Sequence, residues 1–119
     1  MTPDRSAVTT HVLDTALGRP AAGVPVRLER VQTPADTQGS TAVASGTTDA
    51  DGRVTDLGPD RLEPAAYRLV FDTAAYFAAT GQTAFFPEVA LTFTLSDSEQ
   101  HHHVPVLLSP FAYSTYRGS

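Results

Sequence analysis

Residues 89–108, VALTFTLSDSEQHHHVPVLL, decide the fold, because they contain two apolar runs around a polar turn. In the first run every second residue is large and apolar: Val89, Leu91, Phe93 and Leu95. This period of two is typical of a β-strand with one buried face, since successive side chains of a strand point to opposite sides. A second strand is predicted for residues 101–108, after the polar turn at 96–100. The stretch therefore indicates two strands.

The rest of the chain repeats this pattern in short runs that are separated by turn residues. Further strands are predicted at 8–14, 24–29, 41–48, 53–57 and 67–72. Turns or loops are expected at 18–20, 33–40, 49–52 and 59–64, where glycine, proline and polar residues gather. Short alternating runs of this kind predict an all-β sandwich of two antiparallel sheets, with about seven or eight strands.

One helix is predicted, over residues 73–80. Asp72 or Thr73 provides the N-cap, and Gly81 ends the helix. About two turns do not hold in water by themselves, so the helix needs tertiary packing. Tyr76 and Phe77 are the expected packing residues.

Length, charge and composition limit the class of protein. The 119 residues fit a single domain, 1–119. A net charge of −5 argues against a nucleic-acid partner, because neutralising phosphate needs a basic surface. The absence of cysteine excludes disulfides, thiolate metal sites and a cysteine nucleophile. No apolar run reaches the ~20 residues of a membrane span, and the first residues lack the pattern of a secretory signal. We expect a cytoplasmic protein without a membrane partner.

Titratable groups gather near the end of the sequence. Alternation along 101–108 places His101 and His103 on one face of the strand, and His102 on the face of the apolar residues. Other candidate site groups are His11 in the first strand, Arg53 after an Asp-Gly turn, and Arg117 and Ser119. Each also has a structural interpretation, because histidines occupy polar surfaces and arginines occupy solvated turns.

A metal site is an alternative use of the histidines. His11, His101 and His103 would match the three-histidine pattern of a catalytic zinc site. However, nothing in the sequence makes the three converge, and no spaced carboxylate completes a zinc signature. The run at 49–52, DADG, does not form a calcium loop, because its glycine comes too early and no glutamate closes it. We therefore expect no metal.

Several segments carry the motifs of one known family: HVLD (11–14), GRPA (18–21), DGR (51–53), FFPE (85–88), HVP (103–105), LLSP (107–110) and YSTYRGS (113–119). With them the chain resembles the 5-hydroxyisourate hydrolases, the transthyretin-like enzymes of urate breakdown. The likeness covers nearly the whole chain, and the terminal motif is its most specific part.

The resemblance implies an eight-stranded transthyretin-like sandwich that assembles as a homotetramer, with active sites between dimers and no cofactor. It implies hydrolysis of 5-hydroxyisourate to 2-oxo-4-hydroxy-4-carboxy-5-ureidoimidazoline. The catalytic residues that it implies are His11, Arg53, His103 and Ser119. The substrate-binding residues are expected to be Tyr116, Arg117, Gly118 and His101.

A division of labour is hypothesised on this basis. His103 is the expected general base, because an ordinary histidine pKa of about 6.5 leaves the ring mostly neutral near pH 7. Arg53 is expected to oppose protonation of that ring and to hold the oxyanion. His11 would orient the substrate or exchange a proton with the leaving nitrogen, and Ser119 would hydrogen-bond the ring or position water.

Two other functions stay open. A transthyretin-like carrier of a small aromatic molecule shares the expected fold, and a fold does not decide a function. Such carriers lack the terminal Tyr-Arg-Gly-Ser and the histidine pair. A β-sandwich interaction module is the third interpretation, but it leaves the clustered histidines unexplained.

Overall fold

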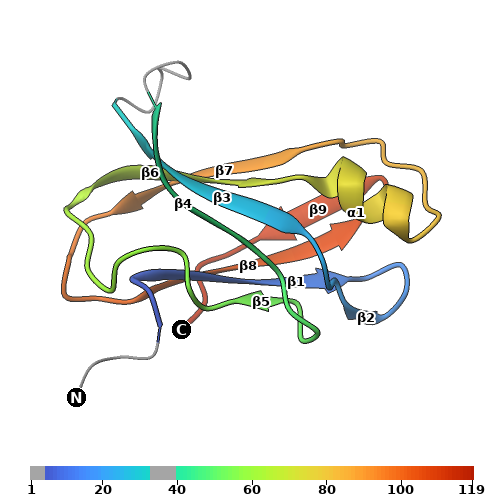
Figure 1. Ribbon diagram of the computed structural model, residues 1–119, viewed down its shortest axis with the longest axis horizontal. Helices are drawn as coiled ribbons and strands as arrows, with labels where there is room; N and C mark the ends of the chain where they lie inside the picture. The colour runs from blue at the N-terminus through green and yellow to red at the C-terminus, as the bar shows by residue number, and fades with distance from the viewer. Residues whose placement is uncertain (1–4, 33–39) are drawn as a thin grey trace.

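Two sheets pack face to face in the computed structural model, which describes residues 5–32 and 40–119 (Figure 1). The five-stranded sheet has the order β2-β1-β8-β9, and β5 also pairs with β1. The four-stranded sheet has the order β4-β3-β6-β7. The elements are β1 Val8–Asp14, β2 Arg19–Pro20, β3 Pro25–Val31, β4 Ser40–Thr47, β5 Arg53–Val54, β6 Ala65–Phe71, α1 Thr73–Ala79, β7 Val89–Leu95, β8 His102–Ser109 and β9 Ala112–Thr115. The predicted all-β sandwich is therefore confirmed, but the five-stranded sheet is mixed and not purely antiparallel, because β1 pairs with β8 in parallel.

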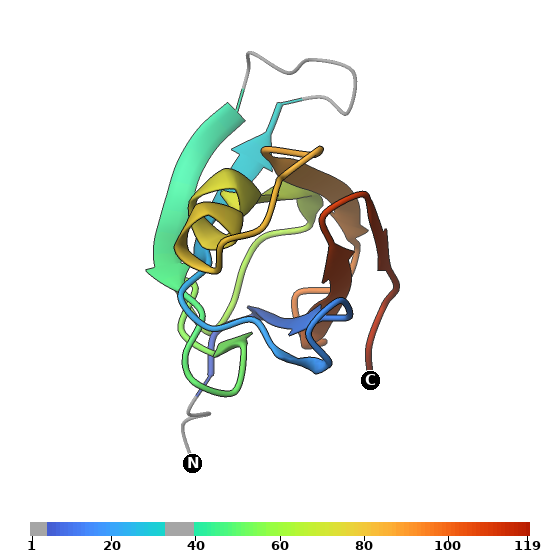
Figure 2. The ribbon, with the colours of Figure 1, turned by 90° about the vertical axis from the view of Figure 1, so that its right-hand side faces the viewer.

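The core lies between the two sheets, which curve around a common interior (Figure 2). Its largest fully buried side chains include Tyr67, Phe71, Phe77, Leu28 and Leu69. Strand β7 has the predicted alternation, with Val89 and Leu95 buried and the small or polar residues between them exposed. The apolar period of two thus reports which face of the strand meets the other sheet.

Strand β8 has the same alternation and carries the histidines. His102 is only 4% exposed and shares the core face with Val104, Val106 and Leu108. This is the face that the sequence predicts for it. The neighbouring position, His103, consequently lies on the outer face of the five-stranded sheet.

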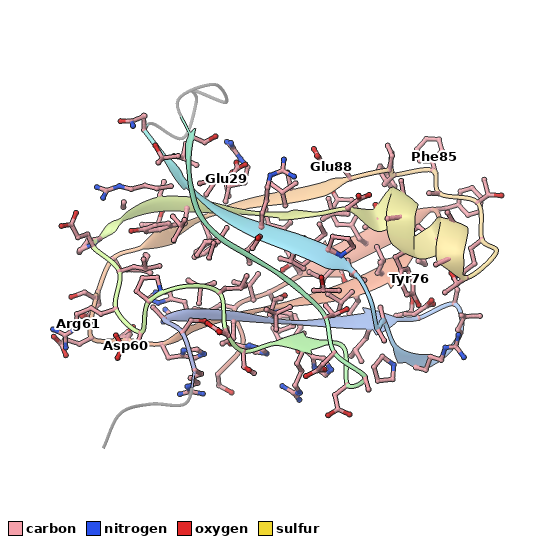
Figure 3. All side chains as sticks on the ribbon, viewed as in Figure 1. Glu29, Asp60, Arg61, Tyr76, Phe85 and Glu88 are labelled. Atoms are coloured by element: carbon pink, nitrogen blue, oxygen red, sulfur yellow. The ribbon has the colours of Figure 1, made fainter. Side chains whose placement is uncertain are left out.

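Helix α1 closes one end of the sandwich. The side chain of Asp72 caps its N-terminus by accepting a hydrogen bond from the backbone N–H of Ala75, at 3.1 Å. Tyr76 and Phe77 are buried, as predicted, and Gly81 has a positive φ after the last turn. Tyr76 reaches from α1 toward the end of β1, where its hydroxyl donates to Asp14 (Figure 3). The cap and the packing together hold a helix of seven residues.

Several boundaries differ from the sequence prediction, and those of β3, β4, β6 and α1 shift by only one or two residues. Residues 19–20, expected in a turn, form the short strand β2 on β1, and Ala112–Thr115 form β9, so that nine strands are described. Strand β5 ends at Val54 and not at residue 57, and β8 begins at His102 and not at His101. The loop predicted for 33–40 lies outside the described residues, except for Ser40, the first residue of β4. In the part of the chain described, no helix has the length and apolar character needed to span a membrane.

Candidate active site

Strand β1 brings the predicted site residues together because it pairs on both of its sides. Its parallel pairing with β8 sets Thr9 opposite His103, and its antiparallel pairing with β5 sets His11 opposite Arg53. Residues directly opposite each other in a sheet point to the same face. All four therefore lie on the outer face of the five-stranded sheet, away from the core.

A glycine turn fixes the position of Arg53. The carbonyl of Gly52 accepts a hydrogen bond from the N–H of Val12 at 2.7 Å, so the turn lies directly against β1. Gly52 has φ +75°, and a Cβ at this position would overlap the carbonyl of Val12. Only glycine satisfies both conditions without strain. Arg53, the next residue, is thereby held beside His11.

The residues after β9 return to the same face of the sheet. The backbone N–H of Gly118 donates to the carbonyl of His103 at 2.8 Å. This bond carries the end of the described chain across β8 and toward β1 and β5 (Figure 1). Tyr116 and Ser119 consequently meet the histidines, although they are far from His11 in the sequence.

These elements enclose a cavity of about 400 Å³. Seven of the eight predicted site residues line it: His11, Arg53, His101, His103, Tyr116, Gly118 and Ser119. Thr9 and Arg5 also line it, and neither was singled out as a site residue from the sequence. The cavity therefore combines imidazole, guanidinium and hydroxyl groups from distant segments.

Arg117 is the predicted site residue that the described chain does not bring into this cavity. It lines a second cavity of about 370 Å³ together with His102, beside β7. Its guanidinium donates to the side-chain oxygen of Gln100 at 3.0 Å. Tyr116 lines both cavities, whereas Arg117 lines only the second, a difference that sequence spacing alone does not reveal.

The environment of His103 favours a neutral ring. Burial lowers the pKa of His103 below its usual value, and the nearby positive charge of Arg53 lowers it further. His11 and Arg5 add smaller effects in the same direction, whereas the backbone carbonyl of Thr9 opposes them. Because a neutral imidazole has a free lone pair, His103 has the protonation state that a general base needs near pH 7.

Thr9 joins the two histidines that share its face. Its Oγ1 lies 2.8 Å from Nδ1 of His103 and 2.9 Å from Nε2 of His101. Burial also lowers the pKa of His101, and the charge of Arg5 adds to this effect. The sequence contained a signal for Thr9, because it precedes His11 by two residues and so shares its strand face.

In the described chain, the histidines of this cavity do not gather with acidic side chains. Within residues 5–32 and 40–119, no three His, Asp or Glu side chains come close enough together to hold one metal ion. Nε2 of His101 and Nδ1 of His103 are both engaged with Thr9. The donor set of the cavity thus suits proton transfer and anion stabilisation.

Fold and site together define a transthyretin-like β-sandwich with a histidine- and arginine-lined cavity on its five-stranded sheet. Residues 8–118 match the HIUase/Transthyretin family, and the chain belongs to that family. A 5-hydroxyisourate hydrolase of Mus musculus is 44% identical over 120 residues, which cover 100% of both chains. Another, from Deinococcus radiodurans, is 45% identical over 117 residues, which cover 94% of this chain and 95% of the relative.

Superposition of the chain on solved structures indicates the same family. The 5-hydroxyisourate hydrolase of Klebsiella pneumoniae superposes with a TM-score of 0.80 at 35% identity, over 94% of this chain and 98% of that one. Sea bream transthyretin in complex with thyroxine superposes with a TM-score of 0.81 at 28% identity, over 94% of each chain. The fold is therefore shared by proteins of both kinds, and the cavity residues must decide between them.

Proposed function

We propose that this protein hydrolyses 5-hydroxyisourate to 2-oxo-4-hydroxy-4-carboxy-5-ureidoimidazoline in urate degradation. One observation carries the proposal: His103, with a lowered pKa, shares a cavity with Arg53, His11 and Ser119. Relatives over 40% identical along nearly the whole chain bear the name of this hydrolase. We further propose that residues 1–119 act as a single domain.

His103 acts as the general base. Its Nδ1 is taken up by Thr9, so Nε2 is the ring nitrogen left to accept a proton from water. The hydroxide that forms attacks the ring carbonyl carbon, and the guanidinium of Arg53 stabilises the oxyanion. Removing a comparable oxyanion donor typically costs about 10²–10³-fold in kcat. The nearby charge of Arg53 also keeps His103 neutral between turnovers.

Collapse of the oxyanion breaks the carbon–nitrogen bond of the six-membered ring. The leaving nitrogen then needs a proton, and His11, which lies opposite Arg53 on the neighbouring strand, supplies or relays it. Ser119 and Tyr116 line the cavity and orient the substrate through their hydroxyl groups. All atoms balance, because one water is added across the bond that breaks.

The protein works as a homotetramer in which active sites lie between dimers. The cavity supports this arrangement, because it opens on the outer face of the five-stranded sheet, where the half-buried Leu13 provides apolar surface. A second copy facing this surface would complete the wall of the site. Analytical ultracentrifugation tests the assembly. The cytoplasmic location stays a prediction, which cell fractionation tests.

The decisive experiment follows the ultraviolet decay of freshly generated 5-hydroxyisourate, with and without the protein and with added chelator. We expect acceleration that survives chelation. His103→Ala should abolish it while leaving an intact fold by circular dichroism, and added imidazole should restore part of the rate. Arg61→Ala is the matched control, because Arg61 pairs with Glu99 in solvent at the end of the molecule opposite α1 (Figure 3).

Three other outcomes of this experiment would contradict part of the proposal. Loss of acceleration on chelation would assign the activity to a metal. Saturable binding of an aromatic ligand without any acceleration would favour the transthyretin-like carrier. Near-native turnover in His103→Ala would remove His103 from the role of base.

A further inference from the structure

The hydroxyl of Thr9 occupies a position between two imidazoles. The parallel register of β1 and β8 sets Thr9 opposite His103, and His101 precedes His103 by two residues on the same face. Thr9 Oγ1 is within hydrogen-bond distance of Nδ1 of His103 and Nε2 of His101. With the side chain almost fully buried, at 4% exposure for Thr9, the hydroxyl has little access to water.

A hydroxyl carries one hydrogen, so Thr9 donates to one ring at most. At least one of the two imidazoles must therefore present an N–H to it. If Nδ1 of His103 carries the hydrogen, the Thr9 hydroxyl is free to donate to Nε2 of His101. In the opposite order, Nε2 of His103 carries a hydrogen and is unable to accept a proton from water. The direction of the two hydrogen bonds through Thr9 therefore decides whether His103 is able to act as a base.

The groups around the two rings are consistent with the first arrangement, in which Nδ1 of His103 carries the hydrogen. The backbone carbonyl of Thr9 raises the pKa of His103 against the larger effects of burial and Arg53, and the Oγ1 of Thr9, which meets Nδ1, is able to accept a hydrogen bond from it. The carbonyl of Ser6 acts in the same way on His101, against burial and Arg5. In the described part of the chain, no carboxylate hydrogen-bonds or ion-pairs with His103. Histidine bases in other hydrolases are usually oriented by such a group.

We propose that Thr9 and His101 are positioning residues, which hold His103 in the tautomer whose Nε2 is free to take a proton from water. The inference rests on the proposed function, because it concerns the base of that reaction. Thr9 is the direct partner of the ring, and His101 acts through Thr9 by accepting its hydroxyl hydrogen. Neither residue needs to touch the substrate for this role.

The first test reads the tautomer in the free protein. Nitrogen-15 NMR of histidine-labelled protein, above the pH at which the rings titrate, should show hydrogen on Nδ1 of His103 in the wild type and in Thr9→Ser. Thr9→Val has a similar shape but no hydroxyl, and it should return His103 to the Nε2–H form that a histidine side chain prefers in water. Thr15→Val is the control, because Thr15 bonds the carbonyl of Leu108, outside the cavity.

The second test uses kinetics. Loss of the partner that orients a metal-ligating histidine typically costs about 10–100-fold. We expect a loss of the same order in kcat for Thr9→Val, with KM little changed. The acidic limb of the pH–rate profile should shift to lower pH, since the lost hydrogen bond stabilised the protonated ring. The charged or titratable groups that act on His103 are Arg53, His11 and Arg5, and those that act on His101 are Arg5, His103 and, from the other face of the strand, His102. All of them stay unchanged in this variant.

His101→Phe completes the test, because it keeps a ring but removes the acceptor. If both residues act through one chain of hydrogen bonds, the double variant should lose no more rate than Thr9→Val alone. Additive losses would overturn the shared chain. Hydrogen on Nε2 of His103 in the wild type, or unchanged rate and tautomer in a folded Thr9→Val, would overturn the proposal. A wild type that lacks hydrolase activity would overturn the proposed function and leave the NMR result standing.

Discussion

Gly118 and His103 are joined through their backbones: the N–H of Gly118 donates to the carbonyl of His103 at 2.8 Å. The approach is so close that a Cβ built on Gly118 would lie 2.6 Å from Cδ2 of the His103 ring. The residue that brings Ser119 to the cavity thus also forms one wall for the proposed base. Its hydrogen atom in place of a side chain is what permits the imidazole to stay where it is.

Gly118→Ala should therefore lower activity much more than stability. The new methyl group collides with the His103 ring and displaces it, and a displacement of about 1 Å at a reacting group costs up to about 10²-fold. Steady-state kinetics and thermal melting check this. Gly81→Ala should show the opposite behaviour, because its positive φ disfavours alanine while no atom lies within 4 Å of the added Cβ. Equal kinetics in both variants would contradict the expectation.

Removal of residues 116–119 should abolish turnover and leave the sandwich folded. The deleted residues are exposed or half-buried and belong to no strand of the core, so Tm should fall by less than about 4 °C. They nevertheless supply Tyr116, Ser119 and the bridge to His103. Ser119→Ala separates the hydroxyl from the bridge. A truncated protein with its full rate would show that this segment has no part in the reaction.

Arg53→Gln should move the acidic limb of the pH–rate profile to higher pH. The charge of Arg53 lowers the pKa of His103, second only to burial, so removing the charge lets the pKa of His103 rise. The direction is opposite to that expected for Thr9→Val. The rate at the optimum should also fall, by about 10²–10³-fold if Arg53 holds the oxyanion. A lower rate with an unmoved limb would assign only the second role to Arg53.

Acid stability should depend on Asp14. Burial raises the pKa of Asp14, but hydrogen bonds from Tyr76, Gln82 and two backbone N–H groups outweigh it, so the pKa is lowered. Because the folded value lies below the unfolded value of about 3.9, the stabilisation is present above that pH and disappears as the pH falls through the folded value. Asp14→Asn should cost about 1–3 kcal/mol at pH 7 and progressively less in acid, measured by urea denaturation.

Tyr76 provides the matched variant for Asp14. Burial and the neighbouring carboxylate of Asp14 raise the pKa of Tyr76 to about 12, so its hydroxyl stays protonated and donating throughout the acid titration. Tyr76→Phe removes one donor and should raise the pKa of Asp14, which narrows the pH range of the stabilisation. Carboxyl-carbon NMR titration of Asp14 measures this shift, and an unmoved titration would contradict the assignment.

Local sequence patterns were sufficient to predict the longer strands and the helix. The bounds of β1 follow from alternation that ends at turn residues, and Asp72 and Gly81 mark α1 because capping is a property of neighbouring residues. Two-residue strands such as β2 contain too few residues to show a period. The sequence also did not predict that β7 and β8 belong to different sheets. A turn of polar residues has the same composition whether it joins two strands of one hairpin or crosses between sheets.

The candidate site was predicted as a set of residues, chiefly through the family resemblance and not through geometry. Alternation correctly separated His102 from His101 and His103. Alternation made no prediction for Arg117, because this residue follows the end of β9, where the strand period no longer applies. Its side chain lines the second cavity and bonds Gln100. Thr9 was passed over as one threonine among many, since its importance depends on a register between β1 and β8.

That register also sets the order of events during synthesis. Thr9 and His103 are separated by 94 positions, so β1 leaves the ribosome long before its parallel neighbour exists. Parallel pairing of distant strands is slow, because a large loop must close before any contact is gained. The edge of β1 that later pairs with β8 therefore stays open during most of translation, and an unpaired strand edge of this kind exposes a nascent chain to aggregation. Chaperones that cover sheet edges would act on this segment first.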